Sequence, residues 1–501
     1  MDTFDLNHAI LKIGSKKTPW TIRNSFEGLQ IFGGIGSGKT SGSARFFALK
    51  YLSAGYGGLV LTVKPNEKDE WIKYCELANR ENDVILLEPN GKHFFNFLHY
   101  ESTHAGKKSY TENILQVLKT VIRASEQKDH GKSEDQFWET SLDMLISNTI
   151  ELCSLAYEKI TVDLLYEIAH AASTTYEDNQ QNDNALTKAL KLCKDNVQKL
   201  VKHRLHNAST EIGRMHSMTS KEYDAFIEEI VPETRTAMFI DEFFTETYAN
   251  LNDKTKSIIS FSFTGFLYRL LKEPVYSLFC TKASTFTPED CLNGKIIIIN
   301  LPVKLYQKVG RDVQIMFKYI WQRAMEKRII EKNKRPVFLF ADEAQNFLHE
   351  YDPEYQATAR SSRIATVYIS QNLPNYYANM GGTKAEHKVR SFLGTLATKI
   401  FHANADIETN KYASELIGET YQEKWSEAHT TTKGDVNITK TMTLELMKAV
   451  RPEEFTPLMT GGENNELKVS GYIHTQGLKL TNDQSYDGLI FDQEKNYALN
   501  Y

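Results

Sequence analysis

With 501 residues, the chain is long enough for two or three domains that each bury a core, and its 41% hydrophobic and 25% charged residues are typical of a soluble globular protein. The formal net charge of −5 excludes a globally basic nucleic-acid binder, so any nucleic-acid contact needs a local basic patch or a lumen. The five scattered cysteines include no C-x-x-C pair, which argues against a disulfide framework and against a zinc knuckle.

The first predicted element is a strand–loop–helix unit near the start of the chain. Residues 29–32 predict a short buried strand, and residues 41–52 predict a helix. Between them, GGIGSGKT fits the phosphate-binding pattern G-x-x-x-x-G-K-[ST], whose glycines let backbone N–H groups converge on one anion at a helix start. The predicted nucleotide-binding residues are Gly33, Gly34, Ile35, Gly36, Ser37, Gly38, Lys39, Thr40 and Ser41.

Two of these residues have individual roles. Lys39 is expected to reach the β- and γ-phosphates as a point charge, and the Thr40 hydroxyl is expected to ligate Mg²⁺. ATP and Mg²⁺ are therefore the predicted cofactors. The alternative, a glycine-rich turn before a surface helix, is disfavoured by the flanking strand and helix.

The remaining elements predict an α/β fold. Apolar runs without alternation, typical of a parallel sheet covered on both faces, occur at residues 58–63, 83–87, 295–300, 337–341, 366–370 and 398–401. A helix is predicted over about 310–332, and the polar stretch 429–440 predicts an exposed hairpin or loop. From about 101 to 271, long helical periodicities replace the strand signals. We therefore predict a nucleotide-binding domain in two parts, residues 1–100 and 276–501, with an all-α inserted domain over 101–275.

A second catalytic element follows the strand at 337–341. An apolar strand that ends in Asp342 fits the pattern of a Mg²⁺-binding aspartate, and the adjacent Glu343 is a candidate general base for the attacking water. Without the phosphate-binding loop, solvated acids at a strand end would explain these residues equally well. Together with Lys39 and Thr40, they predict a hydrolysing site.

Three further residues are candidates for catalysis. Gln371 follows the next strand at its carboxyl end, where ligands bind in open α/β sheets, and is expected to bind the γ-phosphate or the lytic water. Arg360 and Arg363 precede that strand and are candidates for a guanidinium that acts on a neighbouring subunit's site. The alternatives are a surface Gln at a loop start and arginines in surface ion pairs.

One predicted helix carries a row of cations. They lie largely off its apolar stripe and are either contacts for DNA phosphates or an ordinary solvated helix face: Lys188, Lys191, Lys194, Lys199, Lys202 and Arg204.

The ordered set of motifs resembles the conjugative coupling proteins of type IV secretion, in the FtsK/HerA-like branch of P-loop motor ATPases. The segments that carry the resemblance are residues 62–67, 95–98, 295–303, 342–345, 370–372 and 393–418. The resemblance implies a RecA-like motor domain with an all-α domain, a hexameric ring around DNA, and ATP with Mg²⁺ at subunit interfaces. It assigns Asp342 to the metal, Glu343 as base, Gln371 as sensor, and Arg360 or Arg363 as the trans-acting finger.

The chain departs from that family in one respect. Membrane-bound coupling proteins carry an N-terminal transmembrane anchor, and here no apolar run approaches membrane-spanning length. We therefore expect a cytoplasmic protein without a transmembrane segment, brought to the inner membrane, if at all, by a partner. The expected partners are DNA, further copies of the chain, and a relaxase, a secretion channel or an effector protein.

Two other functions compete with a DNA motor. The first is an ATPase subunit of a defence or signalling complex that gates a nuclease or another effector. The second is a scaffold that binds nucleotide without hydrolysing it, which the presence of Glu343 and Gln371 disfavours.

Overall fold

The computed structural model describes residues 4–104, 110–130, 136–173, 184–207, 218–380, 385–432, 435–481 and 483–498. The chain divides into two compact units. Unit 1 comprises Met1–Ile85, Glu289–Lys304 and Trp321–Tyr501, and unit 2 comprises Leu86–Pro288 and Leu305–Ile320.

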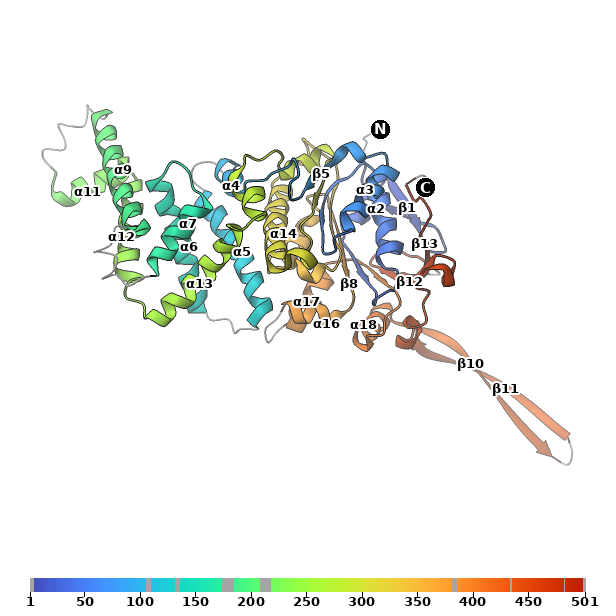
Figure 1. Ribbon diagram of the computed structural model, residues 1–501. Helices are drawn as coiled ribbons and strands as arrows, with labels where there is room; N and C mark the ends of the chain where they lie inside the picture. Colours follow the sequence, from blue (N-terminus) through green and yellow to red (C-terminus); the bar gives the residue numbers. More distant parts are fainter. Residues whose placement is uncertain are drawn as a thin grey trace. The chain divides into compact units, whose positions relative to one another are not determined.

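A nine-stranded sheet with the order β13-β12-β9-β3-β8-β7-β4-β6-β5 organises the nucleotide-binding part of the fold (Figure 1). Adjacent strands from β9 to β6 are parallel, whereas β12 pairs antiparallel with both β9 and β13. The strands are β3 (Leu29–Phe32), β4 (Gly57–Leu61), β5 (Val84–Leu87), β6 (Ile296–Ile299), β7 (Val337–Ala341), β8 (Ile364–Ser370), β9 (Thr398–Phe401), β12 (Lys468–Thr475) and β13 (Tyr486–Asp492).

The predicted α/β class with a parallel central sheet is confirmed. Every residue of β3, β4, β6, β7, β8 and β9 is buried, which explains why these strands are continuous apolar runs. Sequence analysis did not identify β12, whose side chains alternate between half-buried and buried, or β13 at the sheet edge. It also missed the separate hairpin of β1 (Ala9–Ile13) and β2 (Thr18–Thr21).

The helices of unit 1 are mostly short. They are α1 (Ile22–Ser25), α2 (Arg45–Ser53), α3 (Glu67–Leu77), α15 (Asp352–Ala359), α16 (Leu373–Met380), α17 (Ala385–Gly394) and α18 (Ile407–Ile417). Helix α2 packs on α3, and α16 packs on both α17 and α18 (Figure 1). The helix predicted over about 310–332 is α14 (Val303–Glu326), which starts earlier, is broken at Gln307 and ends earlier. Beyond its end, Arg328 donates hydrogen bonds to the carbonyls of Arg335 and Arg363, which hold the chain in a loop.

Unit 2 is helical in its described residues between 97 and 270, with no strand among them. Its helices are α4 (Phe97–His104), α5 (Tyr110–His130), α6 (Gln136–Ala156), α7 (Val162–Ala172), α9 (Ala185–Asn207), α11 (Ser220–Ile230), α12 (Glu233–Glu242) and α13 (Asp253–Leu270). The helical stripe predicted in α6 is buried except at its first residue, as expected for a helix that packs one face on its neighbours. Phe137 is 57% exposed, so its place in the stripe was predicted wrongly, whereas the other predicted members are completely buried: Leu142, Leu145, Ile146, Thr149, Ile150 and Cys153.

The hairpin that was predicted over 429–440 is part of a longer two-stranded ribbon, formed by β10 (Glu419–Thr432) and β11 (Asp435–Lys448). Its strands pair with each other and with no third described strand. Directly opposite residues share a face, and the pairs Tyr421–Leu446 and Trp425–Met442 place apolar side chains on the same face. These side chains are exposed, from 46% at Met442 to 70% at Tyr421.

Two further expectations concern cysteines and membranes. All five cysteines are buried free thiols, so the prediction that the chain has no disulfide framework is confirmed. Within the described ranges, none of the helices combines the length and the hydrophobicity needed to cross a bilayer.

Candidate nucleotide site

The glycine-rich loop follows β3 at the carboxyl end of the sheet. Its turn contains Gly36 and Gly38 with φ of +70° and +75°, a conformation that favours glycine. A Cβ added at Gly38 would lie 2.5 Å from Val469 Cγ2 and 2.8 Å from the Thr460 carbonyl oxygen, so the loop is also closely packed from outside. The predicted helix after the loop starts with a π-helical turn, Thr40–Ala44, and continues as α2.

Backbone hydrogen bonds connect this loop to the two neighbouring strand ends. Gly33 N donates to the carbonyl of Ser370 at 3.3 Å, and Gly34 N donates to that of Ala403 at 2.8 Å. The loop is therefore positioned by the ends of β8 and β9, which come from residues more than 300 positions later in the chain.

Lys39 lies over the loop rather than in solvent. Its Nζ donates to the Gly34 carbonyl at 3.4 Å, and only 9% of the residue is exposed. Burial lowers the pKa of Lys39, although the nearby Asp342 carboxylate opposes the shift. The Ser37 hydroxyl is also buried and has no hydrogen-bond partner. A buried amine, an unpartnered hydroxyl and a tight glycine turn together fit an anionic ligand.

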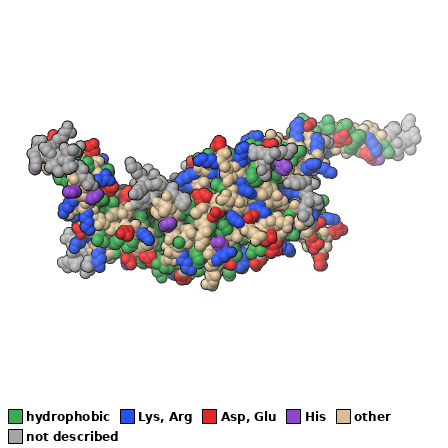
Figure 2. All heavy atoms as spheres, turned by 90° about the horizontal axis from the view of Figure 1, so that it is seen from above, with side chains coloured by type: hydrophobic (Ala, Val, Ile, Leu, Met, Phe, Trp, Pro, Cys, Tyr) green, Lys and Arg blue, Asp and Glu red, His purple; other side chains and the backbone are tan. Residues whose placement is uncertain are grey.

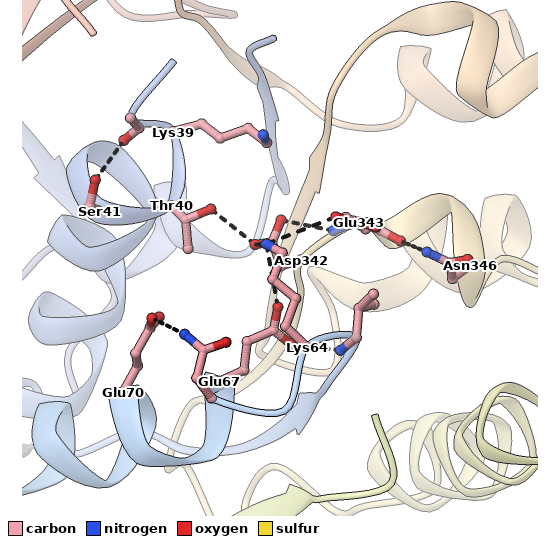
Figure 3. Close-up of polar contacts among 12 residues, drawn as sticks. Lys39, Thr40, Ser41, Lys64, Glu67, Glu70, Asp342, Glu343 and Asn346 are labelled. Atoms are coloured by element: carbon pink, nitrogen blue, oxygen red, sulfur yellow. Dashed lines mark hydrogen bonds and ion pairs between the residues drawn. The ribbon is translucent and has the colours of Figure 1, made fainter. Parts of the chain in front are cut away.

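Asp342 follows the fully buried β7 and connects that strand to the loop helix (Figure 3). Thr40 Oγ1 donates to Asp342 Oδ2 at 2.9 Å, and the Glu343 backbone N–H donates to Asp342 Oδ1 at 2.8 Å. Glu343 itself has a left-handed backbone, with φ 47° and ψ 49°, which is uncommon for a residue with a side chain. Its carbonyl accepts a hydrogen bond from Asn346 Nδ2 at 3.0 Å. The predicted pair of acids thus lies next to Thr40.

A lysine and a glutamate that follow β4 complete the carboxylate cluster (Figure 3). Lys64 Nζ lies 3.4 Å from Asp342 Oδ2, 3.8 Å from Glu343 Oε1 and 3.7 Å from Glu67 Oε1. Burial by itself would lower the pKa of Lys64, but the three carboxylates outweigh it and raise the pKa. Burial, reinforced by the charge of Asp342, raises the pKa of Glu67 to about 7.

The arrangement of oxygen atoms fits Mg²⁺ held through few protein ligands. Among the described residues, no group of three or more His, Cys, Asp and Glu side chains could hold a metal ion. Mg²⁺, however, usually keeps several waters and binds through one or two protein oxygens plus phosphate. Thr40 and Asp342 offer a hydroxyl and a carboxylate in contact, and a cavity of about 20 Å³, lined by them and by Glu67 and Glu70, lies alongside.

Gln371 directly follows β8, at the sheet edge where the glycine-rich loop leaves β3. Ser370 and Phe32 are in register, so Gln371 and Gly33 follow adjacent strand ends. The Gln371 carbonyl accepts a hydrogen bond from Asn404 Nδ2 at 2.8 Å, which connects the ends of β8 and β9. Its position is compatible with the predicted sensor role.

The two arginines lie at the opposite edge of the sheet from the loop, because both precede β8. Arg363 donates hydrogen bonds from Nη1 to the carbonyls of Phe4 and Lys334, both at 3.0 Å. Arg360 is 57% exposed at its side chain, and its ion pair with Glu27 is long, at 3.8 Å. The chain therefore does not bring either arginine to its own glycine-rich loop.

Sequence reasoning missed a buried histidine beside the loop. His402 Nδ1 is 2.8 Å from the Ser470 carbonyl, which can only accept, so Nδ1 carries the proton and Nε2 accepts from Ser43 Oγ at 2.7 Å. Burial lowers the pKa of His402 to about 4.

Lys64 and Glu67 appeared in the sequence analysis only within a segment that resembles the coupling proteins, and neither was given a role. One sequence signal could have identified these two residues and His402. Each follows the carboxyl end of a predicted parallel strand, the edge at which ligand-binding residues gather.

Comparison with known proteins matches one segment of the chain to a family model and the fold to solved structures. Residues 336–460 match the family model described as the TraM recognition site of TraD and TraG. A comparison with curated proteins finds no match. Solved structures of the conjugative coupling protein TrwB match almost the whole chain, so the predicted resemblance to such proteins is confirmed at the level of the fold.

Three TrwB structures illustrate the match. The unbound form without its first 70 residues has a TM-score of 0.58 and 11% identity, covering 98% of this chain and 90% of that chain. The complex with the GTP analogue GDPNP has a TM-score of 0.56 and 12% identity, covering 97% and 90%. The complex with ADP and Mg²⁺ has a TM-score of 0.55 and 12% identity, covering 97% and 91%.

Proposed function

We propose that this chain is an ATP-hydrolysing coupling ATPase that acts on DNA as a ring. The match of residues 336–460 to the model of the TraM recognition site of TraD and TraG, and the fold similarity to conjugative coupling proteins, support the proposal. The observation that carries the proposal is the contact of Thr40 with Asp342 beside Lys39 and Glu343, because it brings the phosphate-binding loop, the proposed metal ligands and the candidate base together. The similarity to TrwB, which binds an ATP analogue and ADP with Mg²⁺, supports the choice of cofactors.

In the proposed reaction, the loop amides and Lys39 hold the β- and γ-phosphates, and Thr40 and Asp342 hold Mg²⁺, which neutralises developing phosphate charge. Gln371 orients a water in line with the γ-phosphorus, and Glu343 accepts a proton from that water as it attacks. The bond between the γ-phosphorus and the bridging oxygen breaks, which releases ADP and phosphate. Asp342 keeps Glu343 in place through the hydrogen bond to its backbone N–H.

The test is ATP turnover by the purified chain, with and without single- and double-stranded DNA. We expect DNA to stimulate turnover, Lys39→Ala to abolish binding and turnover, and Glu343→Gln to keep nucleotide binding while turnover falls by about 10²- to 10⁴-fold. The control variants Lys73→Ala and Glu354→Gln remove one positive and one negative charge from exposed positions outside the site. They should change neither nucleotide binding nor turnover. Turnover that DNA does not alter would exclude a DNA motor, and turnover that survives Lys39→Ala would exclude this site.

In the proposed ring, a neighbouring subunit supplies the trans-acting guanidinium, because neither Arg360 nor Arg363 reaches the glycine-rich loop of its own chain. Arg360 is the better candidate for the trans-acting finger, since its guanidinium is exposed and weakly paired, whereas Arg363 is engaged by two backbone carbonyls. A trans-acting arginine requires several copies of the chain to assemble. We therefore expect the mass of the protein particle in solution to rise when nucleotide and DNA are added.

DNA contacts are proposed on α9 of unit 2. The side chains of Lys188, Lys191, Lys194, Lys199, Lys202 and Arg204 are all exposed. On the face shown in Figure 2, cations and anions are interspersed, which agrees with the need for a local patch rather than a global charge. Replacing Lys194, Lys199 and Lys202 with Gln should weaken DNA binding and flatten its salt dependence, with a change in slope of about one for each phosphate that is no longer neutralised. An unchanged slope would identify α9 as a solvated face.

A partner protein is proposed to contact the β10–β11 ribbon, which lies within the segment that matches the TraM recognition-site model. The exposed apolar face of the ribbon, which carries Trp425 and also includes Leu444, is flanked by the cross-strand ion pairs Glu419–Lys448 and Glu427–Lys440. Such a face suits a protein surface better than DNA. Trp425→Ser with Leu444→Ser should keep basal turnover and abolish association with a purified partner or with further copies of the chain. Unaltered association would contradict this assignment.

The TrwB structures among the matches favour a coupling ATPase over a subunit of a defence or signalling complex. A scaffold that binds nucleotide without turnover would be distinguished by the same ATPase measurement, because any turnover that Glu343→Gln removes excludes it.

A further inference from the structure

Both carboxylate oxygens of Asp342 already have partners within the chain. Oδ1 accepts from the Glu343 backbone N–H at 2.8 Å, and Oδ2 accepts from Thr40 Oγ1 at 2.9 Å and from Lys64 Nζ at 3.4 Å. An oxygen that binds Mg²⁺ lies about 2.0–2.1 Å from the ion, which demands near-ideal octahedral geometry. An ammonium bound to the same oxygen competes with such an ion, both for space and by charge repulsion.

Glu67 offers Lys64 an alternative hydrogen-bond partner. Glu67 Oε2 is held by the Val63 backbone N–H at 2.6 Å, whereas Glu67 Oε1 is buried and has no hydrogen-bond partner. Lys64 Nζ lies 3.7 Å from that Oε1, just beyond hydrogen-bond length. A small rotation of the lysine side chain would therefore exchange Asp342 for Glu67 Oε1 as its hydrogen-bond partner, so that the half-buried ammonium is not left without one.

We infer that Lys64 is a displaceable counter-ion. It neutralises Asp342 until a divalent cation binds between Thr40 and Asp342, and it then moves closer to Glu67 Oε1, the oxygen that lacks a hydrogen bond. The inference rests on the proposed function only in that Asp342 holds the metal. Lys64 is a positioning residue here, because it acts through Asp342.

The same movement alters the surroundings of Glu343. Lys64 Nζ lies 3.8 Å from Glu343 Oε1, so the ammonium that neutralises Asp342 also attracts the proposed base. Movement of Lys64 toward Glu67 would therefore also change its contact with Glu343.

The test is the affinity for Mn²⁺, measured from the electron paramagnetic resonance signal of free Mn²⁺, with ADP and without nucleotide. Lys64→Met removes the competing cation and should tighten Mn²⁺ binding by about fivefold, the order expected when a partly exposed ion pair is lost. Glu67→Gln removes the second partner of Lys64 and should weaken binding by a similar factor. The matched control Lys73→Met removes one cation from an exposed position of α3 and should leave the affinity unchanged.

The double variant decides between displacement and a simpler electrostatic effect. If Glu67 acts through Lys64, then Glu67→Gln has no effect on Mn²⁺ affinity in the Lys64→Met background. If Glu67→Gln weakens binding equally in both backgrounds, Glu67 attracts the metal by itself and the inference is overturned. Unchanged affinity in Lys64→Met would overturn it as well.

A further variant separates this inference from the proposed function. Asp342→Asn should abolish Mn²⁺ binding in any case. If it does while the Lys64 variants behave like the wild type, the metal site stands and the role of Lys64 fails. If Asp342→Asn binds Mn²⁺ like the wild type, the metal site itself is wrong, and the inference fails with it.

Discussion

Thr40 and Asp342 are 302 positions apart in the chain, yet Thr40 Oγ1 donates a 2.9 Å hydrogen bond to Asp342 Oδ2. The contact is possible because β3 and β7 are both neighbours of β8 in one parallel sheet, so the residues after them emerge at the same edge. The proposed phosphate-binding loop and the proposed metal-binding carboxylate are thereby joined by one hydrogen bond.

The first prediction concerns the hydroxyl of Thr40. Thr40→Ser keeps an oxygen that can contact Asp342 and should retain most turnover. Thr40→Ala removes it and should lower turnover by at least about 10²-fold, because the metal loses one of its two proposed protein ligands. Steady-state hydrolysis at varied Mg²⁺ is the measurement, and equal activity of the two variants would contradict the assigned role.

The second prediction compares two glycines of the loop. Gly38→Ala forces both a left-handed alanine and a clash with Val469, and should destabilise the fold by about 2–4 kcal/mol. Gly36→Ala has a similar φ but no atom within 4 Å of the added Cβ, so it should cost only about 1–2 kcal/mol. Urea unfolding provides both values. A larger loss for Gly36→Ala would mean that packing against Val469 is unimportant.

The third prediction uses His402, whose pKa is lowered from 6.5 to about 4 by burial. Because the unfolded chain binds this proton more tightly, stability is full above pH 6.5 and is lost as the pH falls toward 4, by up to about 3 kcal/mol. Glu67, whose pKa is raised, has the opposite dependence, so total stability is not diagnostic.

The diagnostic measurement is the protonation state of the His402 imidazole. Nuclear magnetic resonance of His402 should show a neutral imidazole protonated at Nδ1 at pH 5.5. His402→Asn should lose less stability than the wild type between pH 7 and pH 4.5. A His402 ring that titrates near pH 6.5 would show that it is accessible to water.

The fourth prediction separates the two arginines. Arg363→Ala loses two hydrogen bonds to backbone carbonyls and should destabilise unit 1 by about 1–3 kcal/mol. Arg360→Ala should leave stability within about 0.5 kcal/mol but lower turnover in the assembled state by about 10³-fold or more. Mixing Arg360→Ala with Lys39→Ala subunits should partly restore turnover if the arginine acts in trans. No restoration would place its effect within one subunit.

Much of the sheet could be predicted from local patterns. The strands at β3, β4, β6, β7, β8 and β9 are buried on both faces, and such strands are continuous apolar runs that are visible in the sequence. The last two strands, β12 and the edge strand β13, were not predicted, because they are only partly buried and contain many polar residues. Their positions depend on β9, to which β12 adds in the antiparallel direction.

The sequence by itself determined the glycine-rich loop and its predicted role in phosphate binding, because the glycines, Lys39 and Thr40 lie in one contiguous turn whose spacing is the signal. It also marked Asp342 and Glu343 as acids at a strand end. Only the tertiary structure decided that Lys64 and Glu67 join those acids and that His402 supports the loop helix through Ser43. The order of strands in the sheet sets these contacts, and that order depends on pairing between segments hundreds of residues apart, which no local pattern encodes.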